Sequence, residues 1–194
     1  MDAMDGLEVR GCERCGELCG SRSRIVNGTG PADADLLFVG EAPGEREDDI
    51  GEPFVGRSGD VLEEALRENG LARADVRITN CVRCRPPDNR DPTREELENC
   101  RGYLETEIGQ VAPALLVTLG KVPAEHLLDR SVAITSEAGD TVRANLGGEK
   151  HDVLLSVHPA ATLYDSGQKE TFERAIETAA TVAGSGDQAT FGEF

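Results

Sequence analysis

The sequence predicts a single α/β domain of three layers (α/β/α), in which helices cover both faces of a mostly parallel central sheet. Short apolar runs, each long enough for one buried strand, recur along the chain, and segments with helical periodicity separate them. Strands that alternate with helices in this way form parallel sheets that are buried on both faces. A chain of 194 residues has the length of one ordinary domain.

Four apolar runs are the candidate strands of this sheet. They are rich in leucine, valine and isoleucine, which suit a buried strand. The runs comprise residues 35–39, 76–79, 114–118 and 152–157. Ligands of such sheets bind beyond the carboxyl ends of the strands, so the residues that follow these runs are candidates for a site.

The helices are expected between and after the strands. They comprise residues 59–69, 93–108, 122–128 and 169–183. The second of them begins after Thr93, and Glu96 follows three residues later, a pattern that is typical of a capping box.

The remaining segments complete the domain. We expect residues 132–150 to form an antiparallel hairpin with turns at 138–140 and 147–148. The folded domain then spans residues 1–183 and includes an N-terminal ligand-bearing segment, while residues 184–194 form a flexible acidic tail.

The chain is strongly acidic. Its 37 acidic residues outnumber 20 basic residues, of which three are lysine, and the formal net charge is −17. Such a charge is tolerated where salt screens it, so it is typical of a halophilic cytoplasm and, taken as a whole, argues against a nucleic-acid partner. Residues 77–90 are an exception, because they hold Arg77, Arg83, Arg85 and Arg90 against one acid. They form either a phosphate-binding patch or a solvated loop.

Four of the six cysteines form two pairs of soft ligands that lie far apart in the chain. Cys12 and Cys15 have Cys-x2-Cys spacing, and fifteen residues separate Cys84 from Cys100. Two such pairs predict a metal or iron–sulfur centre that ties the N-terminal segment to the middle of the chain. Spacing alone leaves zinc and a four-cysteine cluster equally open, and unrelated buried thiols are the alternative to both.

The N-terminal sequence is acidic and lacks the apolar run of a signal peptide. No stretch approaches the length of a membrane span, so no membrane partner is expected. We therefore expect a cytoplasmic protein, in which cysteines are more often metal ligands than disulfides.

Three of the candidate strands run into residues of unusual chemistry. The first is followed by Gly-Glu-Ala-Pro-Gly at residues 40–44, the second ends at Asn80, and the last ends at His158. An acid, an amide and an imidazole therefore meet at one edge of the predicted sheet. The convergence carries more weight than any one of these residues, since a glycine-rich turn or a lone histidine is more often structural.

Together these segments resemble the family 4 uracil-DNA glycosylases, which are iron–sulfur repair enzymes of archaea and bacteria. The matching motifs are Gly-Glu-Ala-Pro-Gly at 40–44, Phe-Val-Gly-x-x-Gly at 54–59, Asn-x-x-x-Cys-Arg-Pro-Pro at 80–87 and His-Pro-Ala at 158–160. The match extends over roughly residues 12–165. It implies a uracil-DNA glycosylase-like fold and, with the acidic composition, a halophilic archaeon as the source.

The resemblance also implies the ligands of the centre and the residues that bind the base. A [4Fe–4S] cluster would be held by Cys12, Cys15, Cys84 and Cys100, which leaves Cys19 and Cys81 over. On spacing alone Cys19 could take the place of Cys15, and the family pattern favours Cys15. Uracil would meet the backbone of Gly40, Glu41 and Ala42, the ring of Phe54, the amide of Asn80 and the imidazole of His158.

The activity that follows is hydrolysis of the N-glycosidic bond of uracil in single- or double-stranded DNA, which releases uracil and leaves an abasic site. Better-known uracil glycosylases carry a water-activating aspartate where this chain has Ala42, so Glu41 and Glu47 join His158 as candidate catalytic residues. The protein is expected to act as a monomer. The alternatives are an iron–sulfur or zinc-stapled nucleic-acid-binding module without catalysis, and an iron–sulfur electron carrier.

Overall fold

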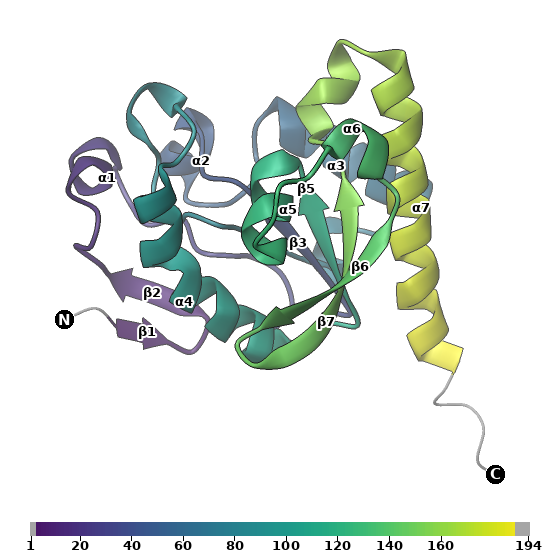
Figure 1. Cartoon of the computed structure of the whole chain (residues 1–194), viewed down its shortest axis with the longest axis horizontal. Coiled ribbons are helices and arrows are strands. Elements are labelled where there is room, and N and C mark those ends of the chain that lie inside the picture. Colours follow the sequence, from purple (N-terminus) through teal and green to yellow (C-terminus); the bar gives the residue numbers. More distant parts are fainter. Residues whose placement is uncertain (1–2, 189–194) are drawn as a thin grey trace.

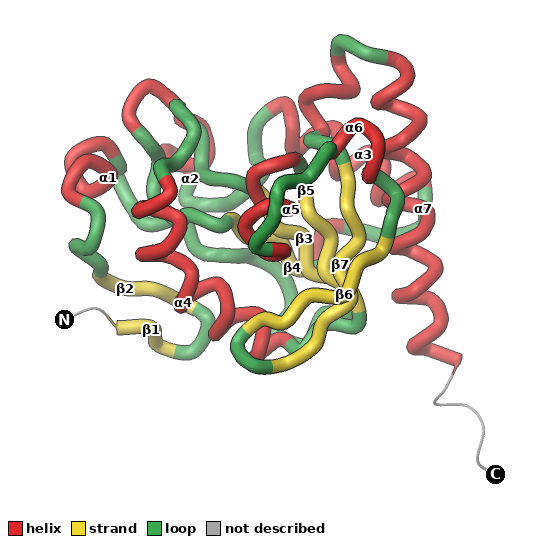
Figure 2. Tube along the Cα trace, in the orientation of Figure 1, coloured by secondary structure: helices red, strands yellow, loops and turns green. Residues whose placement is uncertain are grey.

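The computed structural model describes residues 3–188 and is built around a sheet of five strands (Figures 1 and 2). The strands are β3 (Leu36–Gly40), β4 (Arg77–Asn80), β5 (Leu115–Leu119), β6 (Thr141–Leu146) and β7 (Glu149–Ser156). Their order is β4-β3-β5-β7-β6, and all pairs are parallel except β6 with β7. The four predicted strands are therefore confirmed.

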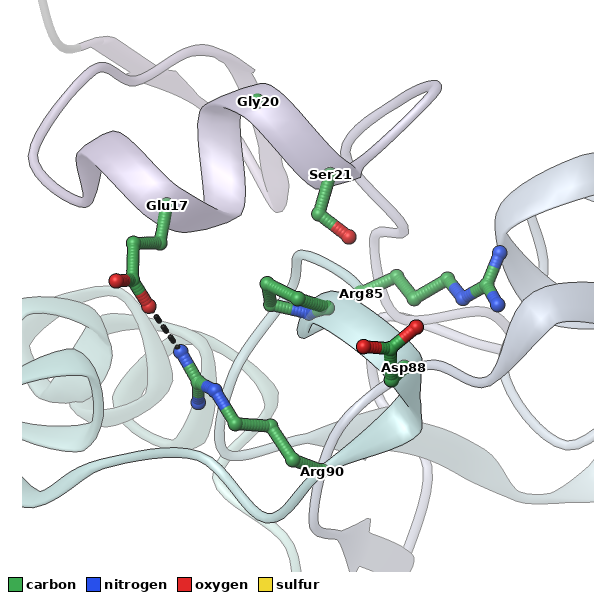
Figure 3. Close-up of a pocket in the computed structure, with 7 residues that line it drawn as sticks. Glu17, Gly20, Ser21, Arg85, Asp88 and Arg90 are labelled. Carbon is green, nitrogen blue, oxygen red and sulfur yellow. Dashed lines mark hydrogen bonds and ion pairs between the residues drawn. The ribbon is translucent and has the colours of Figure 1, made fainter.

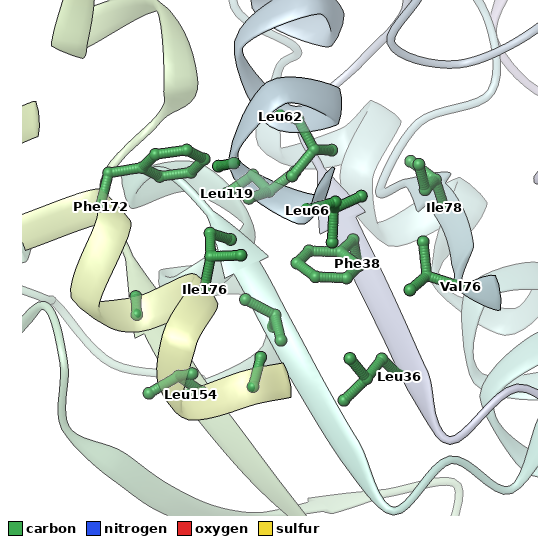
Figure 4. Packing of buried hydrophobic residues seen from close by; sticks show 14 of the residues in the cluster. Leu36, Phe38, Leu62, Leu66, Val76, Ile78, Leu119, Leu154, Phe172 and Ile176 are labelled. Carbon is green, nitrogen blue, oxygen red and sulfur yellow. The ribbon is translucent and has the colours of Figure 1, made fainter. Parts of the chain in front are cut away.

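Helices cover both faces of the sheet, which confirms the three-layer prediction. On one face, α3 (Arg57–Glu68) and α7 (Ser166–Gln188) pack Leu62, Leu66 and Ile176 against Phe38 (Figure 4). On the other, α4 (Arg94–Val111) and α5 (Lys121–Leu128) pack against the alternate residues of the same strand. Every residue of β3, β4 and β5 is buried, as expected for strands covered on both sides.

The expected hairpin over residues 132–150 is only half correct. Residues Ile134–Glu137 form the short helix α6 instead of a strand. Both turns lie where they were predicted: residues 138–139 form a turn in which Gly139 has positive φ (98°), and Gly147 and Gly148, which also have positive φ (59° and 90°), join β6 to β7.

The last helix is longer than expected. α7 continues through Gln188, past the predicted end at residue 183. The rest of the expected tail lies outside the described residues.

The structure also contains short elements that sequence periodicity did not indicate, most of them in the first half of the chain. These are β1 (Ala3–Asp5), β2 (Glu8–Gly11), α1 (Gly16–Ser21) and α2 (Glu45–Ile50), together with the 3-10 turns η1 (Arg73–Asp75), η2 (Pro87–Asn89) and η3 (Pro159–Leu163). β1 and β2 form a separate hairpin beside α4 (Figures 1 and 2), and Leu7 in its turn packs against the same apolar cluster as α4. None of the helices within residues 3–188 combines the length and apolar character needed to cross a bilayer.

Candidate active site

A cavity of about 240 Å³ lies at the carboxyl ends of β3, β4 and β7. Its walls are Glu41, Ala42, Gly44, Glu47, Phe54, Ser58, Asn80 and His158. The predicted convergence of three strand ends on one crevice is therefore confirmed. Of the eight wall residues, only Gly44 and Ser58 were not among the predicted site residues, and both lie within the predicted motifs at 40–44 and 54–59.

Gly40, at the end of β3, lets two side chains of the cavity wall pack closely together. A Cβ atom on Gly40 would collide with Asn80 Oδ1 and with the ring of Phe54, so only glycine lets the strand end approach both side chains. Phe54 itself has a left-handed backbone (φ 54°) and is buried at 7% exposure. Its carbonyl oxygen accepts a hydrogen bond from Arg73 Nη1 at 2.9 Å. This strained loop turns the aromatic ring toward the cavity.

Asn80, in the wall of the cavity, has an unused acceptor. The residue is 3% exposed, and its Oδ1 atom is buried with no hydrogen-bond partner among the described residues. A buried carbonyl without a partner is costly in a finished fold. Such an atom in a cavity wall indicates a site that a ligand's N–H group completes.

His158 is oriented by the 3-10 turn that follows it. Its Nδ1 atom accepts a hydrogen bond from the backbone N–H of Ala160 at 3.1 Å. The proton of the neutral imidazole is therefore on Nε2, at the other side of the ring. Burial lowers the pKa of His158, and the nearby carboxylate of Glu47 opposes this only in part. The cavity thus contains a neutral imidazole that is ready to donate one hydrogen bond.

The two acids of the wall have different surroundings. Glu47 accepts hydrogen bonds from the backbone N–H groups of Gly44 (3.1 Å), Val55 (3.1 Å) and Gly56 (3.0 Å), so it fastens the two motif loops to each other. The half-buried Glu41 instead has its pKa raised to about 7, by burial first and then by a hydrogen-bonded second acid, Asp91. Glu41 is therefore poised to exchange a proton near neutral pH.

The cysteines predicted as ligands come together around α1 and the start of α4. Cys84 and Cys100 are buried with Leu18 and Val82, and Cys15 packs against the same cluster. Burial, opposed by a hydrogen bond from the Arg83 backbone, raises the pKa of Cys100 to about 12, and the thiols of Cys84, Cys15 and Cys12 add to the shift. No group of three or more Cys, His, Asp or Glu side chains between residues 3 and 188 is arranged to hold a single metal ion.

Cys19 also lies near these thiols, since it contributes to the raised pKa values of Cys15 and Cys84. Cys15 is the N-cap of α1, and Cys19 lies one helical turn later, where its N–H donates to the Cys15 carbonyl at 2.9 Å. The fifth thiol is therefore close enough to be tested beside the four predicted ligands.

The predicted arginine patch is wrong for two of its four members. Arg77 and Arg83 are 4% and 2% exposed, and both donate to the fully buried carboxylate of Glu107 at 2.6 Å. Buried guanidinium groups that share a buried carboxylate are part of the core and do not meet phosphate. Arg85 and Arg90 remain at the surface.

A larger cavity of about 730 Å³ lies between α1 and the segment that includes η2 (Figure 3). Arg85 and Arg90 line it together with Glu17 and Asp88, and Arg90 pairs with Glu17 at 2.8 Å. The smaller cavity is the better candidate for chemistry, because the unpartnered amide oxygen and the neutral imidazole line that one.

Sequence reasoning missed Asp48, which stands in the acidic run Glu45-Arg46-Glu47-Asp48-Asp49 that looks like solvated surface. Asp48 is 1% exposed and accepts hydrogen bonds from the backbone N–H groups of Ser23 and Arg24. Its partners lie more than twenty residues away, so no local signal in the sequence marks it.

Comparison with known proteins agrees with the geometry. The family model of the uracil DNA glycosylase superfamily matches residues 27–180. The chain is 39% identical to a type-4 uracil-DNA glycosylase of Archaeoglobus fulgidus, over 89% of each chain. It is 40% identical to the type-4 enzyme of Saccharolobus solfataricus (89% of this chain, 83% of the relative) and 43% identical to that of Thermotoga maritima (80% and 79%).

The superfamily match extends over most of the chain and includes the strand ends that form the cavity, while the type-4 relatives are matched over most of their own length. The chain therefore belongs to the uracil-DNA glycosylase superfamily, and within it to the type-4 uracil-DNA glycosylases.

Proposed function

We propose that this protein is a DNA repair glycosylase that hydrolyses the N-glycosidic bond of uracil in DNA, releasing uracil and leaving an abasic site. The observation that carries the proposal is the unpartnered Oδ1 atom of Asn80 in a cavity that also contains Phe54 and a neutral His158. An enzyme that cuts a base from its sugar must first extrude the base and hold it in such a pocket.

Asn80 is suited to read the edge of uracil. Its Oδ1 atom accepts from N3–H, and its Nδ2 group donates to O4. Cytosine has an acceptor and a donor at the corresponding positions, so it would leave two buried polar groups of the site unpaired. Phe54 supplies an aromatic face for stacking, which contributes about 1–3 kcal/mol for a base in single-stranded complexes.

Cleavage of the glycosidic bond leaves negative charge on O2 of the departing uracil and positive charge on the sugar. The Nε2–H group of His158 and the backbone N–H groups of residues 40–42 stabilise the anion. His158 is neutral before the reaction, so it places no full positive charge beside the bound base. Its hydrogen bond to O2 of uracil strengthens as negative charge develops on that oxygen.

Replacing His158 with alanine is expected to lower the single-turnover rate by roughly a hundred-fold or more, with little change in affinity for uracil-containing DNA. Rapid-quench kinetics with excess enzyme measure the first quantity, and fluorescence anisotropy measures the second. His151, a histidine in β7 that lies outside the cavity, provides the control variant His151→Ala. Weakened binding with an intact chemical step would make His158 a DNA-positioning residue.

Glu41 is the better candidate for activating water, because Glu47 is occupied by three backbone N–H groups. A general base works only when ionised, and the pKa of Glu41 is raised to about 7 by burial and by Asp91. Excision is therefore expected to rise with pH through about 7. Single-turnover rates between about pH 5 and pH 9 measure this dependence.

Two variants separate Glu41 from other titrating groups. Glu41→Gln is expected to remove the dependence and most of the rate. Asp91→Asn takes away the acid that helps to raise the pKa of Glu41, so it should move the rise to lower pH. An unchanged midpoint in Asp91→Asn would assign the pH dependence to a different group.

The four cysteines are suited to hold a [4Fe–4S] cluster. Cys84 and Cys100 are buried, and neighbouring thiols raise the pKa of each beyond the effect of burial. Thiols that lie this close together can serve as ligands of one centre, which takes them as thiolates. Cys12, Cys15, Cys84 and Cys100 would be its ligands, and the cluster would supply a covalent link between the N-terminal segment and the core.

The decisive experiment is incubation of the purified protein with an oligonucleotide that contains one uracil, followed by detection of free uracil and of alkali-labile abasic sites. Release of uracil would support the proposed glycosylase activity. A coloured protein that binds DNA without releasing uracil would support the alternative of an iron–sulfur-stapled binding module, and a colourless one with bound zinc the zinc-stapled form.

Salt dependence tests the acidic surface. Contacts of Arg85 and Arg90 with phosphate weaken as salt rises, but salt also screens the net charge of −17 that repels DNA. We expect uracil release to stay flat or to reach an optimum near about 1 M KCl. A steady loss of activity from about 0.1 M upward would contradict a halophilic origin. A cytoplasmic location and a monomeric state remain part of the proposal.

A further inference from the structure

Arg22 contacts two of the proposed cluster-ligand segments at once. It follows the last residue of α1, and its half-buried guanidinium group donates from Nη1 to Cys84 Sγ at 2.8 Å. The Nη2 group donates to the carbonyl oxygen of Cys12 at 2.7 Å. The Arg22 side chain thus joins the N-terminal ligand pair to Cys84, which lies 62 residues after Arg22 in the sequence.

The position of Arg22 is fixed by the residues that follow it. The N–H group of Ser23 donates to both carboxylate oxygens of Asp48 (2.9 and 2.8 Å), and that of Arg24 donates to Oδ1 at 3.3 Å. Because Asp48 is 1% exposed, this anchor lies in the interior. The backbone at residue 22 is therefore held in place, so little freedom is lost when the guanidinium group meets the sulfur.

We propose that Arg22 is a positioning residue for the iron–sulfur cluster. Its guanidinium group holds the Cys84 thiolate in place as a ligand and raises the reduction potential of the cluster. The proposal rests on the cofactor assignment made above. A charged hydrogen bond to a thiolate is stronger than a neutral one and stabilises the ligated, deprotonated form. Hydrogen bonds to cluster sulfurs and nearby charge are known to set cluster potentials.

The direction of the effect on potential follows from charge. One-electron reduction by dithionite adds one negative charge to the cluster and breaks no bond. A guanidinium group in contact with a ligand sulfur stabilises the more negative form more than the less negative one. Removal of Arg22 is therefore expected to make the cluster harder to reduce as well as easier to lose.

The test compares Arg22→Leu and Arg22→Lys with a control in the same segment. Arg24 lies two residues later and directs its guanidinium group to the Ile50 carbonyl oxygen at 3.4 Å, so Arg24→Leu removes the same charge without touching a sulfur. Each protein is purified with its cluster. The readouts are iron content, the rate at which visible absorbance is lost to a chelator, and the reduction potential from a dithionite titration followed by electron paramagnetic resonance.

We expect Arg22→Leu to lose its cluster at least about ten-fold faster than the wild type and to show a lower potential, while Arg24→Leu matches the wild type. Arg22→Lys retains the positive charge but lacks the planar pair of donors. Its reduction potential should therefore lie close to that of the wild type, while its cluster is still lost faster. If Arg22→Leu is insoluble, the retention rate of Arg22→Lys decides the proposal.

The role of Arg22 would be overturned if Arg22→Leu retained its cluster and its reduction potential as the wild type does. It would also be overturned if Arg22→Leu and Arg24→Leu changed the rate of cluster loss and the potential equally. A wild-type protein without an iron–sulfur chromophore would overturn the cofactor assignment and this proposal together. Uracil release is not among the readouts, so failure of this proposal remains distinct from failure of the proposed activity.

Discussion

Asn80→Asp is expected to reduce the single-turnover rate of uracil excision by roughly a thousand-fold. The substitution retains the shape of the side chain but replaces its N–H donor with a second acceptor. Because the residue is 3% exposed, the new carboxylate would face O4 of uracil in a nearly dry pocket. The base would then meet a repelling oxygen where it now meets a donor.

The measurement is uracil release under single-turnover conditions, with cytosine release recorded from a matched oligonucleotide. Asn145→Asp is a suitable control, since it makes the same chemical change at an exposed position of β6. A wild-type rate in Asn80→Asp would show that another group reads the edge of the base. A gain of cytosine excision would instead confirm that Asn80 sets the choice between the two bases.

Cys84→Ala is expected to abolish the visible absorbance of the cluster and to lower the free energy of unfolding by more than about 4 kcal/mol. The loss has two parts. A cluster held by Cys12, Cys15, Cys84 and Cys100 closes a long loop of the unfolded chain, and that constraint disappears. The thiol is also buried, at 6% exposure, against Leu18 and Val82, so its removal leaves a cavity.

Urea unfolding together with the absorbance spectrum tests this expectation. Cys19→Ala is the matched control, because Cys19 lies among the same thiols but outside the predicted ligand set. It should retain the cluster. If Cys19→Ala lost the cluster while Cys15→Ala retained it, the assignment of the ligands would have to change.

The fold could be predicted well where elements are long or buried. The four strands and the cores of α3, α4, α5 and α7 follow from apolar runs and helical periodicity. The N-terminal hairpin could not be predicted, because strands of three and four residues carry too little pattern. They depend on a distant contact, since Asn27 accepts from Val9 N–H at 2.8 Å and donates to its carbonyl oxygen at 3.2 Å.

The site was predicted better than its surroundings. Asn80, Phe54 and His158 line one cavity, as expected from motifs that each lie at a strand end or in a loop. The arginines of residues 77–90 were misjudged in part, because exposure depends on a partner that spacing does not reveal. Glu107 lies in α4 and neutralises two of them from the interior. Ion pairs between distant segments leave no periodic signal in a sequence.

The two consecutive carboxylates of α2 have a consequence for how the molecule opens. Glu47 holds the N–H groups of Gly44, Val55 and Gly56, and Asp48 holds those of Ser23 and Arg24. Unwinding of this one six-residue helix would release all five amides together. We therefore expect the cavity loops and the segment beside the cysteines to open as one cooperative unit, with their amide hydrogens exchanging with solvent together.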